Sequence, residues 1–201
     1  MTRDVLPQEL QHLVDHFSRL AEFADGMPCE DTPLGILTRQ FFQNNWRNCK
    51  EGLLCKTNKI RVWPAPGQAP RTFKFEIDCR YKCKRSLDAP VELMSGPVRG
   101  NVFYRPDVFA NTDDPAVAVA LDQDQSFFHA NYSRAKGFIC LGELPPNPYP
   151  FPLDLLLENL VYPLVSYQSR RPVHPFDLEA AHYFALDPDA MQGLEPVEPL
   201  Y

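Results

Sequence analysis

The stretch from Thr72 to Lys84 reads TFKFEIDCRYKCK and alternates between two classes of side chain. The largely apolar positions are Phe73, Phe75, Ile77, Cys79 and Tyr81, and the charged positions between them are Lys74, Glu76, Asp78, Arg80 and Lys82. Successive side chains of a β-strand point to opposite faces of a sheet, so this period of two predicts a strand with one buried and one solvated face. One-sided burial is typical of antiparallel sheets. We therefore expect an antiparallel sheet covered on one face.

Further short extended runs lie on both sides of this strand. We expect strands at 53–56, at 59–63, at 91–104 with a break at Gly96-Pro97, and at 117–121. Turn-rich segments such as 105–115 separate them. The four runs at 53–56, 59–63, 72–84 and 91–104 follow one another and predict a four-stranded antiparallel meander, and 117–121 is one more strand.

Helical periodicity predicts helices before and after the strands. Apolar residues recur at intervals of three and four, the spacing of one helix face. The expected helices span 7–23, 31–48, 153–168 and 176–186. The third is the most apolar and should pack on the sheet as a core helix, with Pro163 causing a kink or an early end. Together these elements predict an α+β fold.

Length and composition predict a single core. The chain has 201 residues, of which 44% are hydrophobic, and this is enough for one domain of ordinary size. We expect an N-terminal helical region at 1–50, a core at 51–186 and an acidic, proline-containing tail at 187–201. The tail offers few core candidates, so we expect it to be loosely held.

Charge and cysteine usage exclude several classes of function. A net charge of −6 argues against nucleic acid as a partner, and no apolar run is long enough to span a membrane. The first residues lack the apolar core of a signal peptide, so we expect a cytoplasmic protein with six reduced cysteines. Their spacing is not that of a structural zinc site, and we expect neither a metal nor a cofactor.

A second stretch, FFHANYSRAKGFICL at 127–141, brings together three residue types that can carry chemistry. Cys140 is a candidate nucleophile because a thiolate attacks carbonyl carbon readily. Asn131 contributes a carboxamide and His129 an imidazole close to it in the sequence. Each also has an ordinary alternative: a small buried cysteine, an asparagine that caps its own turn, and a packed histidine.

The motif and the order of elements resemble those of the ubiquitin-conjugating enzymes. In that family a His-Pro-Asn triplet precedes the acceptor cysteine by about ten positions, and a G-x-I-C-L stretch carries the cysteine. Here His129-Ala130-Asn131 precedes Gly137-Phe138-Ile139-Cys140-Leu141, with one extra residue of spacing. The resemblance in residues covers roughly 70–186. The expected order of elements, which is an N-terminal helix, strands, a central helix and a short last helix, is also similar to that of the family.

The resemblance implies a function and partners. Cys140 would carry a ubiquitin-like modifier as a thioester and transfer it to a lysine of a target protein. Asn131 would stabilise the oxyanion, and His129 would brace the turn. An adenylating enzyme of the ubiquitin-activating type would load the carrier. Ala130 replaces the family proline, and such divergence resembles bacterial conjugation systems found in antiphage defence operons.

One further candidate residue lies beyond the central helix, and two other functional classes stay open. The resemblance places His174 near the position where the family orients the attacking lysine, and an imidazole could accept its proton. An ordinary loop histidine is the alternative. Two other functional classes stay open: a Cys-His thiol hydrolase using Cys140 and His174, and a catalytically idle adaptor of the same fold.

Overall fold

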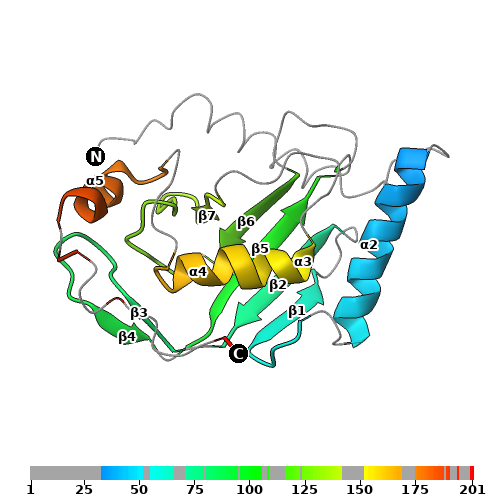
Figure 1. Ribbon diagram of the computed structural model, residues 1–201, viewed down its shortest axis with the longest axis horizontal. Helices are drawn as coiled ribbons and strands as arrows, with labels where there is room; N and C mark the ends of the chain where they lie inside the picture. The colour runs from blue at the N-terminus through cyan, green and yellow to red at the C-terminus, as the bar shows by residue number, and fades with distance from the viewer. Residues whose placement is uncertain are drawn as a thin grey trace.

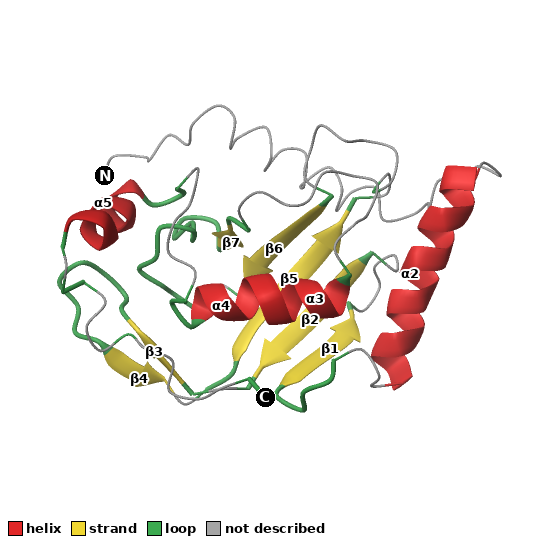
Figure 2. Ribbon diagram, viewed as in Figure 1, coloured by secondary structure: helices red, strands yellow, loops and turns green. Residues whose placement is uncertain are grey.

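The computed structural model describes the ranges 33–51, 55–65, 71–78, 80–94, 96–105, 116–122, 124–141, 152–168 and 175–187, with residues 108, 189–190, 194 and 200–201. The described part is an α+β arrangement of two antiparallel sheets and helices (Figures 1 and 2). The expected helix at 7–23, Cys79, His174 and the greater part of the proline-rich segment 145–152 lie outside these residues.

The larger sheet has five strands, not the four expected. In spatial order they are β1 (Ile60–Pro64), β2 (Thr72–Ile77), β5 (Val98–Tyr104), β6 (Val117–Leu121) and β7 (Phe138–Ile139). Every neighbouring pair is antiparallel. The strand expected at 53–56 is not formed at 55–56, the part of this run that the structure describes. The strand that was not expected is β7, whose two residues are too few to produce an alternation that a sequence pattern would reveal.

A separate hairpin of β3 (Tyr81–Cys83) and β4 (Glu92–Met94) also departs from the prediction, which joined 72–84 into one strand and 91–104 into another. The ladders that flank β2 end together, because Ile77 pairs with Ile60 on one side and with Val98 on the other. The Asp78 amide still donates to the Lys59 carbonyl at 2.7 Å, and residues 81–83 pair with 92–94 instead of with the larger sheet. The break expected at Gly96-Pro97 is confirmed between β4 and β5.

Burial along β2 follows the predicted alternation with one exception. Phe73, Phe75 and Ile77 are buried, and Lys74 is exposed. Glu76, expected on the solvated face, is only 8% exposed. Its carboxylate forms ion pairs with Arg61 of β1 and Arg99 of β5, the latter at 2.9 Å. The cross-strand arginines cover the carboxylate, and the pattern of a single strand cannot reveal this.

The central helix covers one face of the sheet, as predicted (Figure 2). It runs through α3 (Leu153–Leu156), a π-helical turn η1 (Leu157–Val161) and α4 (Tyr162–Val165). Pro163 lacks an N–H, and its ring would collide with the carbonyl four residues earlier in a regular α-helix. The wider π-helical turn directly before α4 accommodates the proline, so the helix continues to Val165.

The helix α2 (Pro33–Glu51) lies beside the edge strand β1 (Figure 1). A helix was expected at 31–48 with Pro33 in its first turn, where proline is favoured, and the observed helix begins at Pro33. Phe42 is fully buried and packs edge-to-face against Tyr104 of β5, with ring centroids 6.1 Å apart. This helix therefore contributes to the same core as the sheet.

The C-terminal residues contradict the expectation of a loosely held tail. Leu194 and Leu200 are 1% and 6% exposed and belong to the hydrophobic core. The Thr57 hydroxyl donates to the Leu200 carbonyl at 2.9 Å, and the Tyr201 hydroxyl donates to Glu158. The sequence contains no indication of these contacts, because the tail is acidic and proline-rich and its isolated leucines produce no periodic pattern.

Gly100 provides a test of the packing between β5 and its neighbours. A Cβ there would collide with the Ala120 carbonyl and lie 2.8 Å from the Phe75 ring, whereas a Cβ at Gly96 would meet nothing within 4 Å. We expect Gly100→Ala to lower the free energy of unfolding by about 2–3 kcal/mol and Gly96→Ala to change it by less than about 0.5 kcal/mol. Urea denaturation measures both, and equal effects would contradict the close approach.

Candidate functional site

The stretch 127–141 folds back on itself and brings its polar residues together. The Cys140 amide donates to the Asn131 carbonyl at 2.7 Å, and the Ser133 amide donates to the Phe138 carbonyl at 2.8 Å. These bonds pair the segment after His129 with β7. Asn131 and Cys140, which are nine positions apart, therefore lie opposite each other.

Gly137 makes the return possible. Its φ of +74° lies in the left-handed region that glycine enters at little cost, and a Cβ there would lie 2.8 Å from the Leu121 carbonyl of β6. The Leu121 amide also donates to the Gly137 carbonyl at 2.8 Å. The turn is thus fixed to the larger sheet.

The Asn131 side chain points at the backbone of Cys140. Its Nδ2 donates to the Cys140 carbonyl at 3.2 Å, and the residue is only 3% exposed. Among the described residues, no donor lies within hydrogen-bond distance of the other polar side-chain atom, the acceptor Oδ1. The carboxamide therefore fixes the position of Cys140, and its nitrogen retains a second N–H.

The described cysteines differ in burial: Cys49 and Cys83 are buried, whereas Cys55 and Cys140 are partly exposed. The Cys140 thiol is free and lies at the end of β7. Burial raises the pKa of Cys49 and of Cys55 to about 12, with nearby carboxylates contributing at Cys55, and burial also raises the pKa of Cys83. These three thiols stay protonated at neutral pH and are weak nucleophiles.

His129 is held inside the fold. It is 2% exposed, and its Nδ1 accepts the Asn131 backbone amide at 3.0 Å, which requires that this nitrogen carry no proton. Its ring packs against the rings of Tyr167 and Phe184, at centroid distances of 5.2 and 6.4 Å. This geometry is that of a structural hydrogen-bond acceptor rather than of a solvent-facing base.

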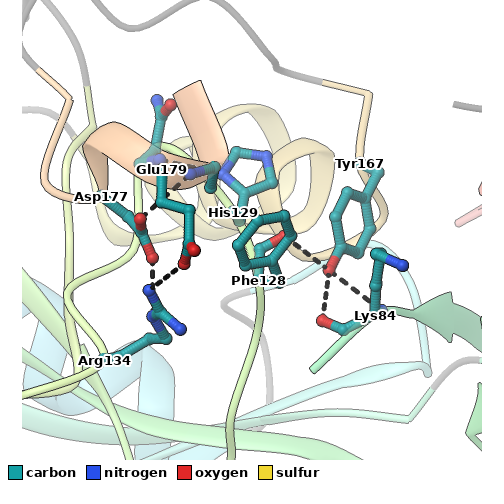
Figure 3. A network of polar contacts seen from close by, with 9 residues as sticks. Lys84, Phe128, His129, Arg134, Tyr167, Asp177 and Glu179 are labelled. Carbon is teal, nitrogen blue, oxygen red and sulfur yellow. Dashed lines mark hydrogen bonds and ion pairs between the residues drawn. The ribbon is translucent and has the colours of Figure 1, made fainter. Parts of the chain in front are cut away.

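Tyr167, at the end of the central helix, supports the same turn and was not identified by sequence reasoning. Figure 3 shows its hydroxyl between Lys84 and Phe128. The hydroxyl accepts the Lys84 amide at 3.2 Å and lies 3.1 and 3.2 Å from the carbonyls of Lys84 and Phe128. Burial raises the pKa of Tyr167, so the hydroxyl keeps the proton with which it donates. The residue has φ of +58°, which no feature of the sequence signals.

An ion-pair cluster ties α5 (Leu178–Leu186) to the turn (Figure 3). Arg134 pairs with Asp177 at 2.7 Å and with Glu179 at 3.0 Å. Asp177 also caps the helix, because its side chain accepts the Ala180 amide at 3.0 Å. The amides of Phe176 and Asp177 donate to the Ala130 carbonyl at 2.9 and 3.2 Å. The helix at 176–186 was expected with a polar cap, but its attachment to the motif was not.

The structure thus brings together Cys140, Asn131 and His129, three of the four residues that sequence reasoning selected. The fourth, His174, lies outside the described residues, so its role as a base stays a prediction. Within the described ranges, no group of three His, Cys, Asp or Glu side chains could hold a metal ion. No described helix is long and apolar enough to cross a membrane.

Comparison with known proteins leaves the geometry as the basis for interpretation. No protein-family model matches the chain, and no curated protein is significantly similar to it.

The Tyr167 hydroxyl offers a test of how the turn is held. We expect Tyr167→Phe to lower the free energy of unfolding by about 1–3 kcal/mol, because the variant leaves buried backbone groups of Lys84 and Phe128 with fewer partners. Tyr183→Phe is the control: its ring packs on the same cluster at Phe128. That variant should cost less than about 0.5 kcal/mol in the same denaturation experiment. Equal losses would contradict a special role for the Tyr167 hydroxyl.

Proposed function

We propose that this chain is an acyl carrier of the ubiquitin-conjugating type. Cys140 would hold the C-terminus of a ubiquitin-like modifier as a thioester and pass it to a lysine of a target protein. The observation that supports this most directly is the 3.2 Å hydrogen bond from the Asn131 carboxamide to the Cys140 carbonyl. It joins the two halves of the motif on which the family resemblance rests.

The proposed reaction has two exchanges at one carbonyl carbon. In the first, the Cys140 thiolate attacks the modifier's thioester on an activating enzyme, a new S–C bond forms, and the activating enzyme's thiolate leaves. In the second, a lysine amine attacks, a C–N bond forms, the S–C bond breaks, and the Cys140 thiolate is restored. The amine loses a proton, for which His174 is the proposed acceptor.

Asn131 has two roles in this proposal. One N–H of its carboxamide holds the Cys140 backbone in place, as the contact with the carbonyl indicates. The second N–H would donate to the oxyanion that forms when the amine attacks. His129 fixes the Asn131 backbone through Nδ1 and takes no part in proton transfer.

The architecture is compatible with this proposal at a coarse level. An antiparallel sheet covered on one face by a long helix, with a shorter helix after it, has the element order expected of the family. Assignment to a ubiquitin-conjugating fold, to its bacterial branch and to antiphage defence belongs to the proposal and rests on the resemblance.

Two other classes compete with acyl transfer. A papain-like hydrolase would begin a helix at its nucleophile, where the helix dipole lowers the thiol pKa. Cys140 follows a strand, and neither it nor Leu141 is helical, so this reading is less well supported. An idle adaptor would need no reactive thiol, whereas Cys140 is free and partly exposed.

The carrier role predicts a thioester on one named cysteine. Incubation with an activating enzyme, ATP and a ubiquitin-like modifier should give an adduct that a thiol reductant removes. Cys140→Ser should give an adduct that resists the reductant, because an oxyester does not exchange with thiols. Cys140→Ala should give none, and Cys55→Ala, the control at another partly exposed cysteine, should behave as wild type. A thiol-sensitive adduct on Cys140→Ala would contradict the proposal.

The two roles of Asn131 predict separable effects. We expect Asn131→Ala to slow discharge of the preformed thioester to free lysine by about 10²-fold through loss of the oxyanion donor. Loss of the bond to the Cys140 carbonyl should lower the free energy of unfolding by about 1 kcal/mol. Asn101→Ala, which removes a side-chain bond to Asp122 on the sheet, is the matched control and should leave discharge unchanged. If thioester formation and discharge fall equally, Asn131 only positions the cysteine.

A further inference from the structure

Asp177 carries a carboxylate that is buried at the start of α5. Its side chain is only 6% exposed. Oδ1 accepts the Ala180 amide at 3.0 Å and so caps the helix, and Oδ2 lies 2.7 Å from Nε of Arg134. Within the described part of the chain, Arg134 is the cation that pairs with this carboxylate (Figure 3). A buried carboxylate needs a compensating charge, so the position of Asp177 depends on Arg134.

The backbone of Asp177 is bound to the candidate site. The amides of Asp177 and of the residue before it donate to the Ala130 carbonyl at 3.2 and 2.9 Å. Ala130 directly precedes Asn131, whose carboxamide donates to the Cys140 carbonyl. If the Asp177 carboxylate moved toward water, its own amide would be withdrawn from Ala130. The charge of Arg134 and the position of the Asn131 carboxamide are therefore linked through Asp177.

Two further contacts orient the Arg134 side chain. Nη2 pairs with Glu179 at 3.0 Å, and the guanidinium lies over the Phe128 ring, 5.6 Å from its centroid. The Glu179 side chain is 52% exposed, so this pair contributes little on its own. A planar guanidinium can pair with two carboxylates in fixed directions, and the contact with Glu179 thereby turns Nε toward Asp177.

We propose that Arg134 is a positioning residue for the chemistry of Cys140. By compensating the buried charge of Asp177, it keeps the start of α5 on the Ala130 carbonyl and the Asn131 carboxamide beside Cys140. Arg134 takes no part in bond formation or proton transfer. Its effect on acyl transfer rests on the proposed function, whereas its effect on the structure of the turn does not.

Discharge of a preformed Cys140 thioester to free lysine measures the effect on acyl transfer. We expect Arg134→Ala to slow discharge about tenfold, because the Asn131 carboxamide is then less well placed to stabilise the oxyanion. Thioester formation should stay within about twofold of the wild type, which shows that the variant is folded. Arg134→Lys keeps a cation beside Asp177 and should recover most of the discharge rate.

Arg85→Ala is the matched control. The Arg85 side chain is 41% exposed, against 40% for Arg134, and it pairs with the exposed Glu92 on the hairpin. This variant loses the same charge and a surface ion pair, so discharge should be unchanged. Glu179→Gln removes the exposed partner of Arg134 and should leave discharge within about twofold.

Asp177→Asn separates charge compensation from any other role of Arg134. Asparagine caps a helix about as well as aspartate does, and it has no charge to compensate. The double variant Asp177→Asn with Arg134→Ala should therefore discharge at least about fivefold faster than Arg134→Ala alone. If Arg134→Ala alone does not fold, the double variant should restore folding for the same reason.

Hydrogen exchange measured by NMR tests the link to the turn without a modifier. The Cys140 amide is bonded to the Asn131 carbonyl, and Arg134→Ala should speed its exchange at least about fivefold. Arg85→Ala should leave the exchange rate unchanged, and the double variant with Asp177→Asn should slow it again. If the wild-type chain forms no thioester but exchange responds in this way, the proposed function is wrong and the link from Arg134 to the turn stands.

Three results would overturn the proposal. One is wild-type discharge and wild-type exchange in Arg134→Ala. Another is a double variant that is as impaired as Arg134→Ala alone, because the charge of Asp177 would then not be the cause. The third is an equal defect in Arg85→Ala, which would show a general effect of lost positive charge.

Discussion

The antiparallel pairing of residues 131–133 with 138–140 is the constraint on which the candidate site depends. It sets the Asn131 carboxamide 3.2 Å from the Cys140 carbonyl. The pairing requires a left-handed residue at Gly137, and the bond from the Leu121 amide to Gly137 fixes the turn to β6. The sheet therefore positions the cysteine through backbone hydrogen bonds, which are less easily displaced than a long side chain. This arrangement leaves the thiol itself partly exposed.

Local patterns predicted much of the fold, and long-range pairing decided the rest. Alternation correctly identified the buried face of β2, and helical spacing identified α2, the central helix and α5. Where β2 ends was not predictable, because its end is set by its partners at Ile60 and Val98. The burial of Glu76 likewise depends on arginines of two other strands. Leu200 joins the core through contacts with distant segments, so its own composition gave no indication of burial.

In the candidate site, too, contacts between residues close in sequence could be expected, whereas long-range contacts could not. The contact between Asn131 and Cys140 joins residues only nine positions apart on the two sides of one turn, so their proximity could be expected from the sequence. Tyr167 contacts Lys84 across 83 positions, and Arg134 pairs with Glu179 across 45. Such pairs follow from the packing of the central helix and α5, which a single sequence does not specify. His129 illustrates a middle case: its place in the motif was visible, but its protonation followed only from the bond to the Asn131 amide.

The attachment of α5 has a consequence for both ends of that helix. Its start is bound to the Ala130 carbonyl, beside the Asn131–Cys140 contact, and its last residue is the exposed Leu186. Nine helical residues span about 13 Å, so the two ends are separated by a fixed, short distance. Arg134, Asp177 and the buried ring of Phe128 prevent the helix from rotating freely. The position of α5 is therefore tied to that of the turn that carries Cys140.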